Sequence, residues 1–185
     1  MDGPFFVDSR GPHISADIGS VTIGAANKAI VPIANLPVLG SNYFSWIGKA
    51  VRLRIFGRMT TAASAGTHTY TLLWGNGTDA NGTAIMASAA VTLVNAQTNI
   101  SWQLEAIIRC RSLGATGTLF GTGNIIFNNA VVASTNQPVM LPASAPAASA
   151  ALDLTAANVI SPQVLATTST TNTIQVHDFL FEALN

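Results

Sequence analysis

Apolar and polar residues alternate along residues 100–111. The apolar parity comprises Ile100, Trp102, Leu104, Ala106, Ile108 and Cys110; the polar parity comprises Ser101, Gln103, Glu105, Arg109 and Arg111, with only Ile107 out of place. Because successive side chains of a β-strand point to opposite faces, this period of two predicts a long strand with one buried face. Small residues and two glycines at 112–117 suit a turn, and residues 118–127 are again strand-forming. The stretch therefore predicts a long β-hairpin.

A second alternating stretch covers residues 46–59. Its apolar parity comprises Val51, Leu53 and Ile55, and its other parity comprises Arg52, Arg54, Phe56 and, after Gly57, Arg58. Each of these two stretches has one apolar face that must be buried against another element. The two apolar faces are therefore expected to meet in one core.

Further strands are expected on both sides of the hairpin. β-branched and aromatic residues predict a strand at 68–74, ended by the turn-rich residues 75–82, and shorter strands are expected at 83–86 and 90–94. In the last segment, 172–184, the apolar parity switches between Val176 and Phe179, which predicts a bulge near His177 in a central strand. Prolines argue against a helix in the alanine-rich run 143–157, which is expected to be a loop with a short strand at 152–154.

The N-terminal part of the chain lacks such a pattern. Residues 1–28 contain prolines, glycines and scattered apolar residues, which predict an extended arm that can order along another chain. Pro32 and Pro37 interrupt the apolar residues 29–39, so that segment is expected to be an edge strand or an entry into the domain. Residues 29–185 then form one domain of eight to ten strands. We expect an all-β fold, an antiparallel two-sheet jelly-roll sandwich.

Composition narrows the class of protein. The chain has 185 residues, of which 9% are charged, and its eight basic and eight acidic residues give no net charge, whereas about 25% charged residues is usual. A neutral, charge-poor surface suits a subunit packed against others. It argues against a nucleic-acid partner, which needs a basic face. Prolines interrupt the most apolar region, 139–160, which argues against a membrane partner, and no leader is recognised at the N-terminus. We expect a soluble protein made in the cytoplasm.

The order of strand sequences resembles a known family. The motifs are W-x-G-x-x-x-R-L-R at 46–54, T-Y-T-L at 69–72, the hairpin W-x-L-x-x-x-I-x-R-x-x-x-L-G-x-x-G-T at 102–118, and N-T-I-x-V-x-x-F-x-x-E-x-L at 172–184. Together they resemble the tumour-necrosis-factor-like jelly-roll structural proteins of tailed bacteriophages over residues 29–185. The resemblance implies a homotrimer that acts structurally, as a head decoration (cement) protein or as a knob on a fibre or tail.

Catalytic and cofactor chemistry is not expected. His177 and Asp178 are neighbours in an expected strand, so their side chains point to opposite faces and cannot form a nucleophile relay by adjacency. Three histidines without ligand spacing and the single Cys110 do not form a metal site, and residues 79–82 lack the other ligands of a calcium loop. We expect no enzyme activity, no cofactor and no metal.

The polar parity of the two strongest strands carries five of the eight basic residues. One interpretation is a solvated sheet face with Glu105 as ion-pair partner. The other is a contact with a neighbouring subunit or the capsid, for which the forked donors of arginine are suited. The candidate interface residues are Phe5, Phe6, Arg52, Arg54, Phe56, Arg58, Glu105, Arg109 and Arg111.

These inferences lead to a functional hypothesis with two alternatives. The leading hypothesis is a structural virion protein on the capsid exterior, a decoration protein that binds the major capsid protein as a homotrimer and stabilises the head lattice. The first alternative is a receptor-binding module of a fibre or tail tip, in which loops such as 75–82 bind a glycan. The second is a shell-forming jelly-roll capsid subunit, although the chain has no basic arm to meet a packaged genome.

Overall fold

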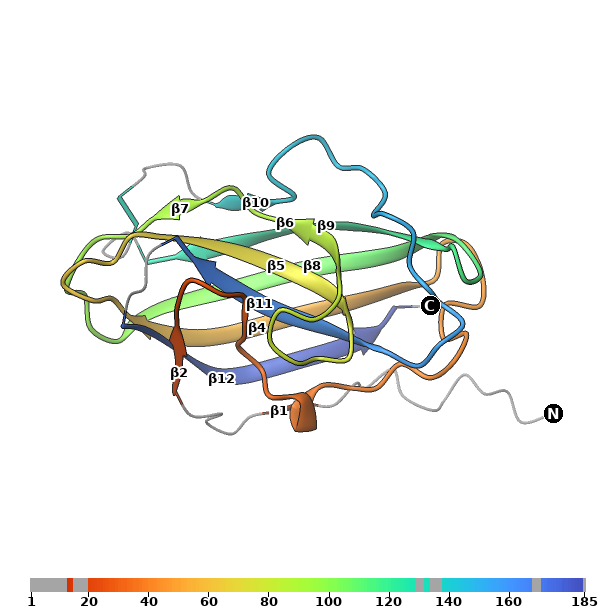
Figure 1. The fold of residues 1–185 in the computed structure, drawn as a ribbon, viewed down its shortest axis with the longest axis horizontal. Helices are drawn as coiled ribbons and strands as arrows, with labels where there is room; N and C mark the ends of the chain where they lie inside the picture. The colour runs from red at the N-terminus through yellow and green to blue at the C-terminus, as the bar shows by residue number, and fades with distance from the viewer. Residues whose placement is uncertain (1–12, 15–19, 129–131, 134–137, 168–170, 185) are drawn as a thin grey trace.

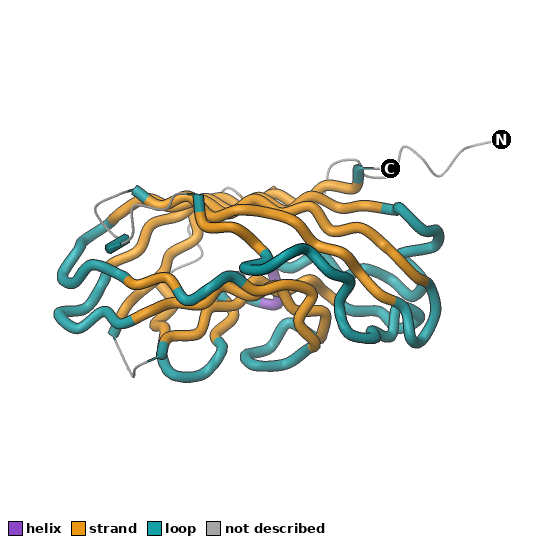
Figure 2. The backbone as a smooth tube through the Cα atoms, turned by 90° about the horizontal axis from the view of Figure 1, so that it is seen from above, coloured by secondary structure: helices purple, strands orange, loops and turns teal. Residues whose placement is uncertain are grey.

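The strands of the protein form two antiparallel sheets that pack face to face (Figure 1, Figure 2). The computed structural model describes residues 13–14, 20–128, 132–133, 138–167 and 171–184. Within them, one sheet has seven strands and the other has five. The expected all-β, antiparallel sandwich with a jelly-roll-like fold is confirmed.

The seven-stranded sheet contains the four longest strands. These are β4 (Ala50–Thr60), β8 (Ile100–Ser112), β9 (Thr118–Phe127) and β12 (Asn172–Ala183). Its strand order is β1-β12-β4-β8-β9-β10, and β2 also pairs with β12. The short strands at its edges are β1 (His13–Ile14), β2 (Ser20–Ile23) and β10 (Val139–Leu141). Segments from both ends of the chain therefore lie next to each other in one sheet.

The expected β-hairpin is confirmed as β8 and β9, whose register runs from Trp102 opposite Phe127 to Ser112 opposite Thr118. The even-numbered residues of β8 from Trp102 to Cys110 are buried, and so are the odd-numbered residues of β4 that lie beside them, Gly57 among them. Both sets face the smaller sheet, where Tyr70 packs against the rings of Trp102 and Phe127. The two apolar faces therefore share one core, as expected.

The five-stranded sheet has a central strand that the sequence pattern did not reveal. It consists of β3 (Lys28–Ala29), β11 (Val159–Ala166), β5 (Thr67–Gly75), β6 (Thr83–Ala87) and β7 (Val91–Thr92). β11 lies between β3 and β5 although it contains Pro162. The Pro162 carbonyl accepts a hydrogen bond from Ile30 N–H, on the β3 side. Because the N–H and C=O of a residue in an antiparallel strand point to the same neighbour, the missing N–H also faces residue 30, beyond the end of the two-residue β3, and the ladder with β5 loses no bond.

The bulge expected near His177 is present. The register between β12 and β4 shifts between Val176 and Asp178, and Ile174, Val176, Phe179 and Phe181 are all buried on the inner face. β12 lies between β4 and the short strands β1 and β2, so it is an interior strand, as expected. An extra residue at the bulge thus keeps both halves of an irregular apolar pattern in the core.

Several sequence-based boundaries were wrong. Residues 46–49 form a turn before β4, where Gly48 has a φ of 94°, and not the start of a strand. At 152–154 the structure has one isolated bridge, between Leu152 and Gly117, in place of a short strand. Residues 13–14 and 20–23 of the expected arm pair with β12 of their own chain. The division into an arm at 1–28 and a domain at 29–185 stays a prediction.

Candidate functional site

The outer face of the seven-stranded sheet carries most of the charged residues of the described chain. The even-numbered residues of β4 and the odd-numbered residues of β8 point away from the core, because their neighbours in each strand are buried. Seven candidate interface residues share this face: Arg52, Arg54, Phe56, Arg58, Glu105, Arg109 and Arg111. Phe5 and Phe6 lie outside the described residues. The structure therefore places these seven residues together on one surface.

An ion-pair network lies at the centre of this face. Glu105 lies opposite Arg54 in the β4–β8 register, and its carboxylate is 3.6 Å from Arg54 Nε and 3.4 Å from Arg52 Nε. Arg52 Nη1 is also 3.4 Å from a carboxylate oxygen of Glu182 on β12. The side chains are 29–39% exposed, so water screens these attractions. The network orders the arginines but leaves guanidinium donors that a partner can use.

Replacing Glu105 with glutamine should lower the free energy of unfolding by at most about 1 kcal/mol. The substitution removes the shared negative charge of Arg52 and Arg54 while keeping the shape of the side chain, and exposed ion pairs contribute about this much. Urea unfolding of both proteins at neutral pH measures the difference. A loss above about 2 kcal/mol would contradict a solvent-screened network.

Aromatic rings lie beneath two of the arginines. The Arg54 guanidinium is 5.3 Å from the centre of the Phe56 ring, and that of Arg111 is 4.4 Å from the Phe120 ring on β9. Such stacking holds an arginine flat over an apolar surface. Phe120 was not recognised from the sequence, because its nearness to Arg111 depends on how β8 and β9 pair.

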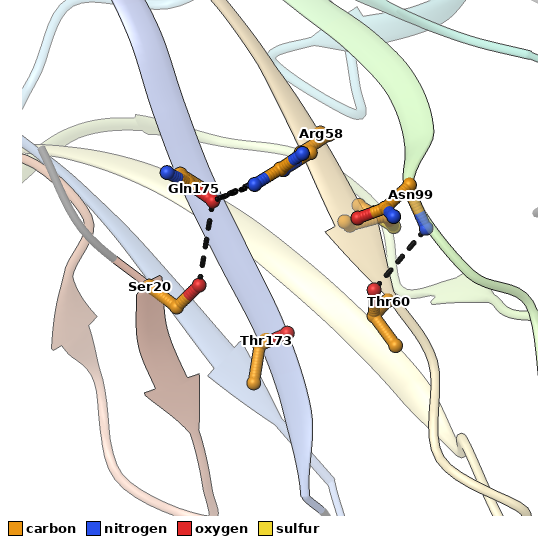
Figure 3. A pocket seen from close by; sticks show the side chains of 7 residues that line it. Ser20, Arg58, Thr60, Asn99, Thr173 and Gln175 are labelled. Atoms are coloured by element: carbon orange, nitrogen blue, oxygen red, sulfur yellow. Dashed lines mark hydrogen bonds between the residues drawn. The ribbon is translucent and has the colours of Figure 1, made fainter. Parts of the chain in front are cut away.

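A small polar hollow lies at the other end of the same face (Figure 3). Arg58 donates two hydrogen bonds, from Nε at 3.0 Å and Nη2 at 2.7 Å, to Oε1 of Gln175 on β12. Ser20, Thr60, Asn99 and Thr173 complete its polar lining, and Asn99 N–H donates to Thr60 Oγ1. With a volume of about 50 Å³, the hollow has room for a water molecule or one small polar group and is too small for a sugar ring. The role of Gln175 could not be anticipated from the sequence, because it depends on the register of β12 against β4.

A buried polar cluster lies near the hollow, on the inner side of the sheet. Asn172 Nδ2 donates to the Ala65 carbonyl at 2.7 Å and lies 2.9 Å from His68 Nε2, and Asn172 Oδ1 accepts from Ala62 N–H at 2.8 Å. His68 Nε2 is therefore the acceptor, and its Nδ1–H faces the Tyr70 hydroxyl at 3.4 Å. Burial lowers the pKa of His68 to about 4 and raises that of Tyr70. His68 is thus neutral at pH 7, and Asn172 ties both the 62–65 loop and His68 to β12.

The free energy of unfolding should fall as the pH is lowered from 7 to 4. The pKa of His68 is about 4 in the folded protein and about 6.5 in an unfolded chain. Between these values only the unfolded chain takes up the proton, so titration of His68 lowers stability by up to about 3 kcal/mol, and this contribution is complete near pH 4. Urea unfolding at pH 7, 6, 5 and 4 measures the slope. The control is His68→Gln, whose own slope should be shallower; equal slopes would contradict the role of His68.

Neither a metal-binding cluster nor a membrane-spanning helix is found among the described residues. No group of three or more His, Cys, Asp or Glu side chains within the described ranges is placed to hold a metal ion. Among the same residues, no helix has the length and apolar character needed to cross a membrane.

Cys110 is buried on the inner face, its thiol donates to the Ser112 carbonyl at 3.4 Å, and burial raises its pKa. The expectation that Cys110 is a core residue is confirmed.

No family model and no curated protein matches this chain. Among solved structures, the chain is similar to a legume lectin-like domain from Entamoeba histolytica, with 9% identity, 90% of each chain covered and a TM-score of 0.30. It is also similar to the CBM2 module of the evolved Dit of Lactobacillus casei BL23 phage J-1, with 6% identity over 79% of this chain and 66% of that one, at a TM-score of 0.27. An engineered GH43 glycoside hydrolase matches at 9% identity and a TM-score of 0.34, and only 30% of that enzyme is covered. These values are too low to transfer a ligand or a residue role.

Proposed function

We propose that the protein is a structural component of a bacteriophage particle, a decoration protein on the capsid exterior. In this proposal the protein acts as a homotrimer without catalytic activity, and it stabilises the head lattice by binding the major capsid protein. The outer face of the seven-stranded sheet supports the proposal most directly.

That face has the composition of a protein contact. Arginines and aromatic residues are enriched where proteins meet, whereas lysine is depleted. Here Arg52, Arg54 and Arg58 alternate with Phe56 along β4, and Arg109 flanks the half-buried Ile107 on β8. This combination of arginines and aromatic rings is more typical of a protein contact than of a sheet face that is exposed only to solvent.

The geometry of the face indicates how a contact would form. Glu105 and Glu182 hold the two central arginines in place, so little side-chain entropy is lost when a neighbour binds. Carbonyl and carboxylate groups of that neighbour can then accept from the remaining guanidinium donors. We assign this central region, with Phe56, to the contact between subunits of the trimer.

The sequence supports the choice of a phage decoration protein over other assembled proteins. The strand motifs at 46–54, 69–72, 102–118 and 172–184 resemble tumour-necrosis-factor-like jelly-roll proteins of tailed phages, and the sandwich fold agrees with that resemblance. With 9% charged residues, the surface has little self-repulsion. Three identical copies on one trimer would also strengthen a weak capsid contact through effective concentration.

Sedimentation with phage heads tests the proposal. The purified protein is mixed with expanded heads of the encoding phage that lack it, and bound protein is counted after centrifugation. Saturable binding of the wild-type protein, together with a trimer mass in solution, supports a decoration role. Failure to bind heads would contradict it, and assembly of the protein alone into closed shells would instead indicate a shell-forming capsid subunit.

A receptor-binding module is the second candidate, because one polar loop is held out on the surface. Residues 76–82 are fixed by an Asp79–Lys28 ion pair and by hydrogen bonds from Ala80 N–H to Gln163 and from Gln163 to the Thr78 carbonyl. Asn76 and Thr78 remain exposed there. Saturable binding on a glycan array without binding to heads would favour this second function.

A further inference from the structure

Three segments of the chain meet at one end of the seven-stranded sheet. Gly48 N–H donates to the Cys110 carbonyl, and Cys110 N–H donates to the Lys49 carbonyl. Leu184 N–H donates to the Ala50 carbonyl. The turn before β4, the turn after β8 and the end of β12 therefore lie side by side, as Figure 1 shows near the label C. We call this end, residues 46–49, 109–113 and 184, the tip.

The tip exposes large apolar side chains from all three segments. Trp46 is 42% exposed, Ile47 65%, Leu113 46% and Leu184 40%. Hydrogen bonds from Gly48 N–H to the Cys110 carbonyl and from Cys110 N–H to the Lys49 carbonyl hold the turn that contains Trp46 and Ile47 beside the end of β8, which leads to Leu113. Single exposed apolar residues are ordinary, but a group of four on adjacent segments indicates a contact surface.

The tip is also positively charged. It contains Lys49, Arg109 and Arg111, and none of these forms an ion pair with a carboxylate of the described residues. Lys49 Nζ lies 4.2 Å from the centre of the Tyr43 ring and 4.6 Å from that of Trp46, which fixes the ring of Trp46 in its exposed position. A partner that covers the apolar group therefore meets three cations around it.

The described surface of a second copy offers few carboxylates that could match this charge. The carboxylates of Asp79, Glu105 and Glu182 are ion-paired within the chain, and that of Asp153 accepts from Thr155. Asp178 also has an interaction within its own chain. Among the described residues, charge complementarity therefore favours a different molecule as the partner of the tip.

We propose that the tip is the surface that contacts the capsid, and that it binds an apolar hollow of the major capsid protein rimmed by carboxylates. This assignment rests on the decoration function proposed above. Trp46 and Ile47 enter the hollow, and Lys49, Arg109 and Arg111 pair with the carboxylates around it. The centre of the outer face then remains available for contacts between subunits.

Head binding by a tip variant tests this assignment. The variant is Trp46→Ser with Ile47→Ser, and the matched control is Ile33→Ser, because Ile33 is 50% exposed and lies beside Gly77 and Val159, away from the tip. We expect the tip variant to remain a trimer but to bind heads at least about tenfold more weakly, the loss expected for a buried anchor. The control should bind as the wild type does. Arg111→Glu should weaken binding and reduce its dependence on salt.

Each other outcome overturns the assignment. Wild-type affinity of the tip variant would leave the decoration function intact and place the capsid contact elsewhere. A loss of the trimer in the tip variant would make the tip a subunit contact. Failure of the wild-type protein to bind heads would remove both proposals together, and binding to vesicles of anionic lipid without binding to heads would make the partner a membrane. Because all four substituted side chains are exposed, thermal unfolding can confirm that each variant is folded.

Discussion

Replacing Gly57 with alanine should destabilise the protein by about 3 kcal/mol or more. Gly57 lies on the inner face of β4, where the register shift of β12 brings the Gln175 carbonyl oxygen over it. A Cβ atom at this position would overlap that oxygen and lie 3.1 Å from Trp102 Nε1. Because the obstruction is backbone in the adjacent strand, β4 and β12 must separate locally, and strain of this kind is among the largest effects of a single substitution.

Gly121→Ala provides a matched control for this result. Gly121 also lies on an inner face, that of β9, but its added Cβ would meet the Met86 side chain, with Sδ at 2.6 Å. Methionine can change rotamer to give way, so this variant should lose less than about 1.5 kcal/mol. Urea unfolding of both variants measures the difference. Equal losses would contradict the close approach of β12 to Gly57.

Replacing Asn172 with alanine should cost about 4 kcal/mol. The Asn172 side chain is fully buried and joins Ala62 N–H, the Ala65 carbonyl and His68 Nε2. Its removal leaves two buried groups and the partly buried Ala62 N–H without partners, and each unpaired buried group costs about 1–3 kcal/mol. The loop before β5 also loses its attachment to the start of β12, so local hydrogen exchange at 62–65 should accelerate.

The control for Asn172 is Asn95→Ala. Asn95 Oδ1 accepts one hydrogen bond, from Ala65 N–H at 2.9 Å, in the same region. The Asn95 side chain is exposed, so water replaces the lost bond and the cost should be about 1 kcal/mol. Chemical unfolding and hydrogen exchange compare the two variants. A loss at Asn172 no larger than that at Asn95 would contradict the buried cluster.

The sequence predicted those strands in which one face is buried and the other is not. β4, β8 and the bulged β12 could be recognised because their apolar residues follow a period of two, interrupted once near His177. β11 could not, because all but one of its residues are buried and Pro162 interrupts it. Gln163 of β11 is hydrogen-bonded to the loop at 76–82. β11 therefore lacks the alternation of buried and exposed residues that marks a strand with one exposed face.

The sequence predicted only those parts of the candidate site that depend on the alternation within one strand. Arg52, Arg54 and Glu105 share a face because of parity within β4 and β8, which can be read from each strand alone. Glu182 and Phe120 join them only through the pairing of β12 with β4 and of β9 with β8. The tip was missed for a different reason: Trp46 and Ile47 were assigned to a strand, whereas they form a turn that exposes both side chains.

An image of the assembled particle tests the central proposal most directly. Heads of the encoding phage would be imaged by electron cryomicroscopy with and without this protein. The decoration function predicts added threefold density on the outside of the capsid, built from three sandwiches, with residues 46–47 and 113 facing the capsid surface. Heads that stay bare in the presence of the protein, or density confined to the tail, would contradict it.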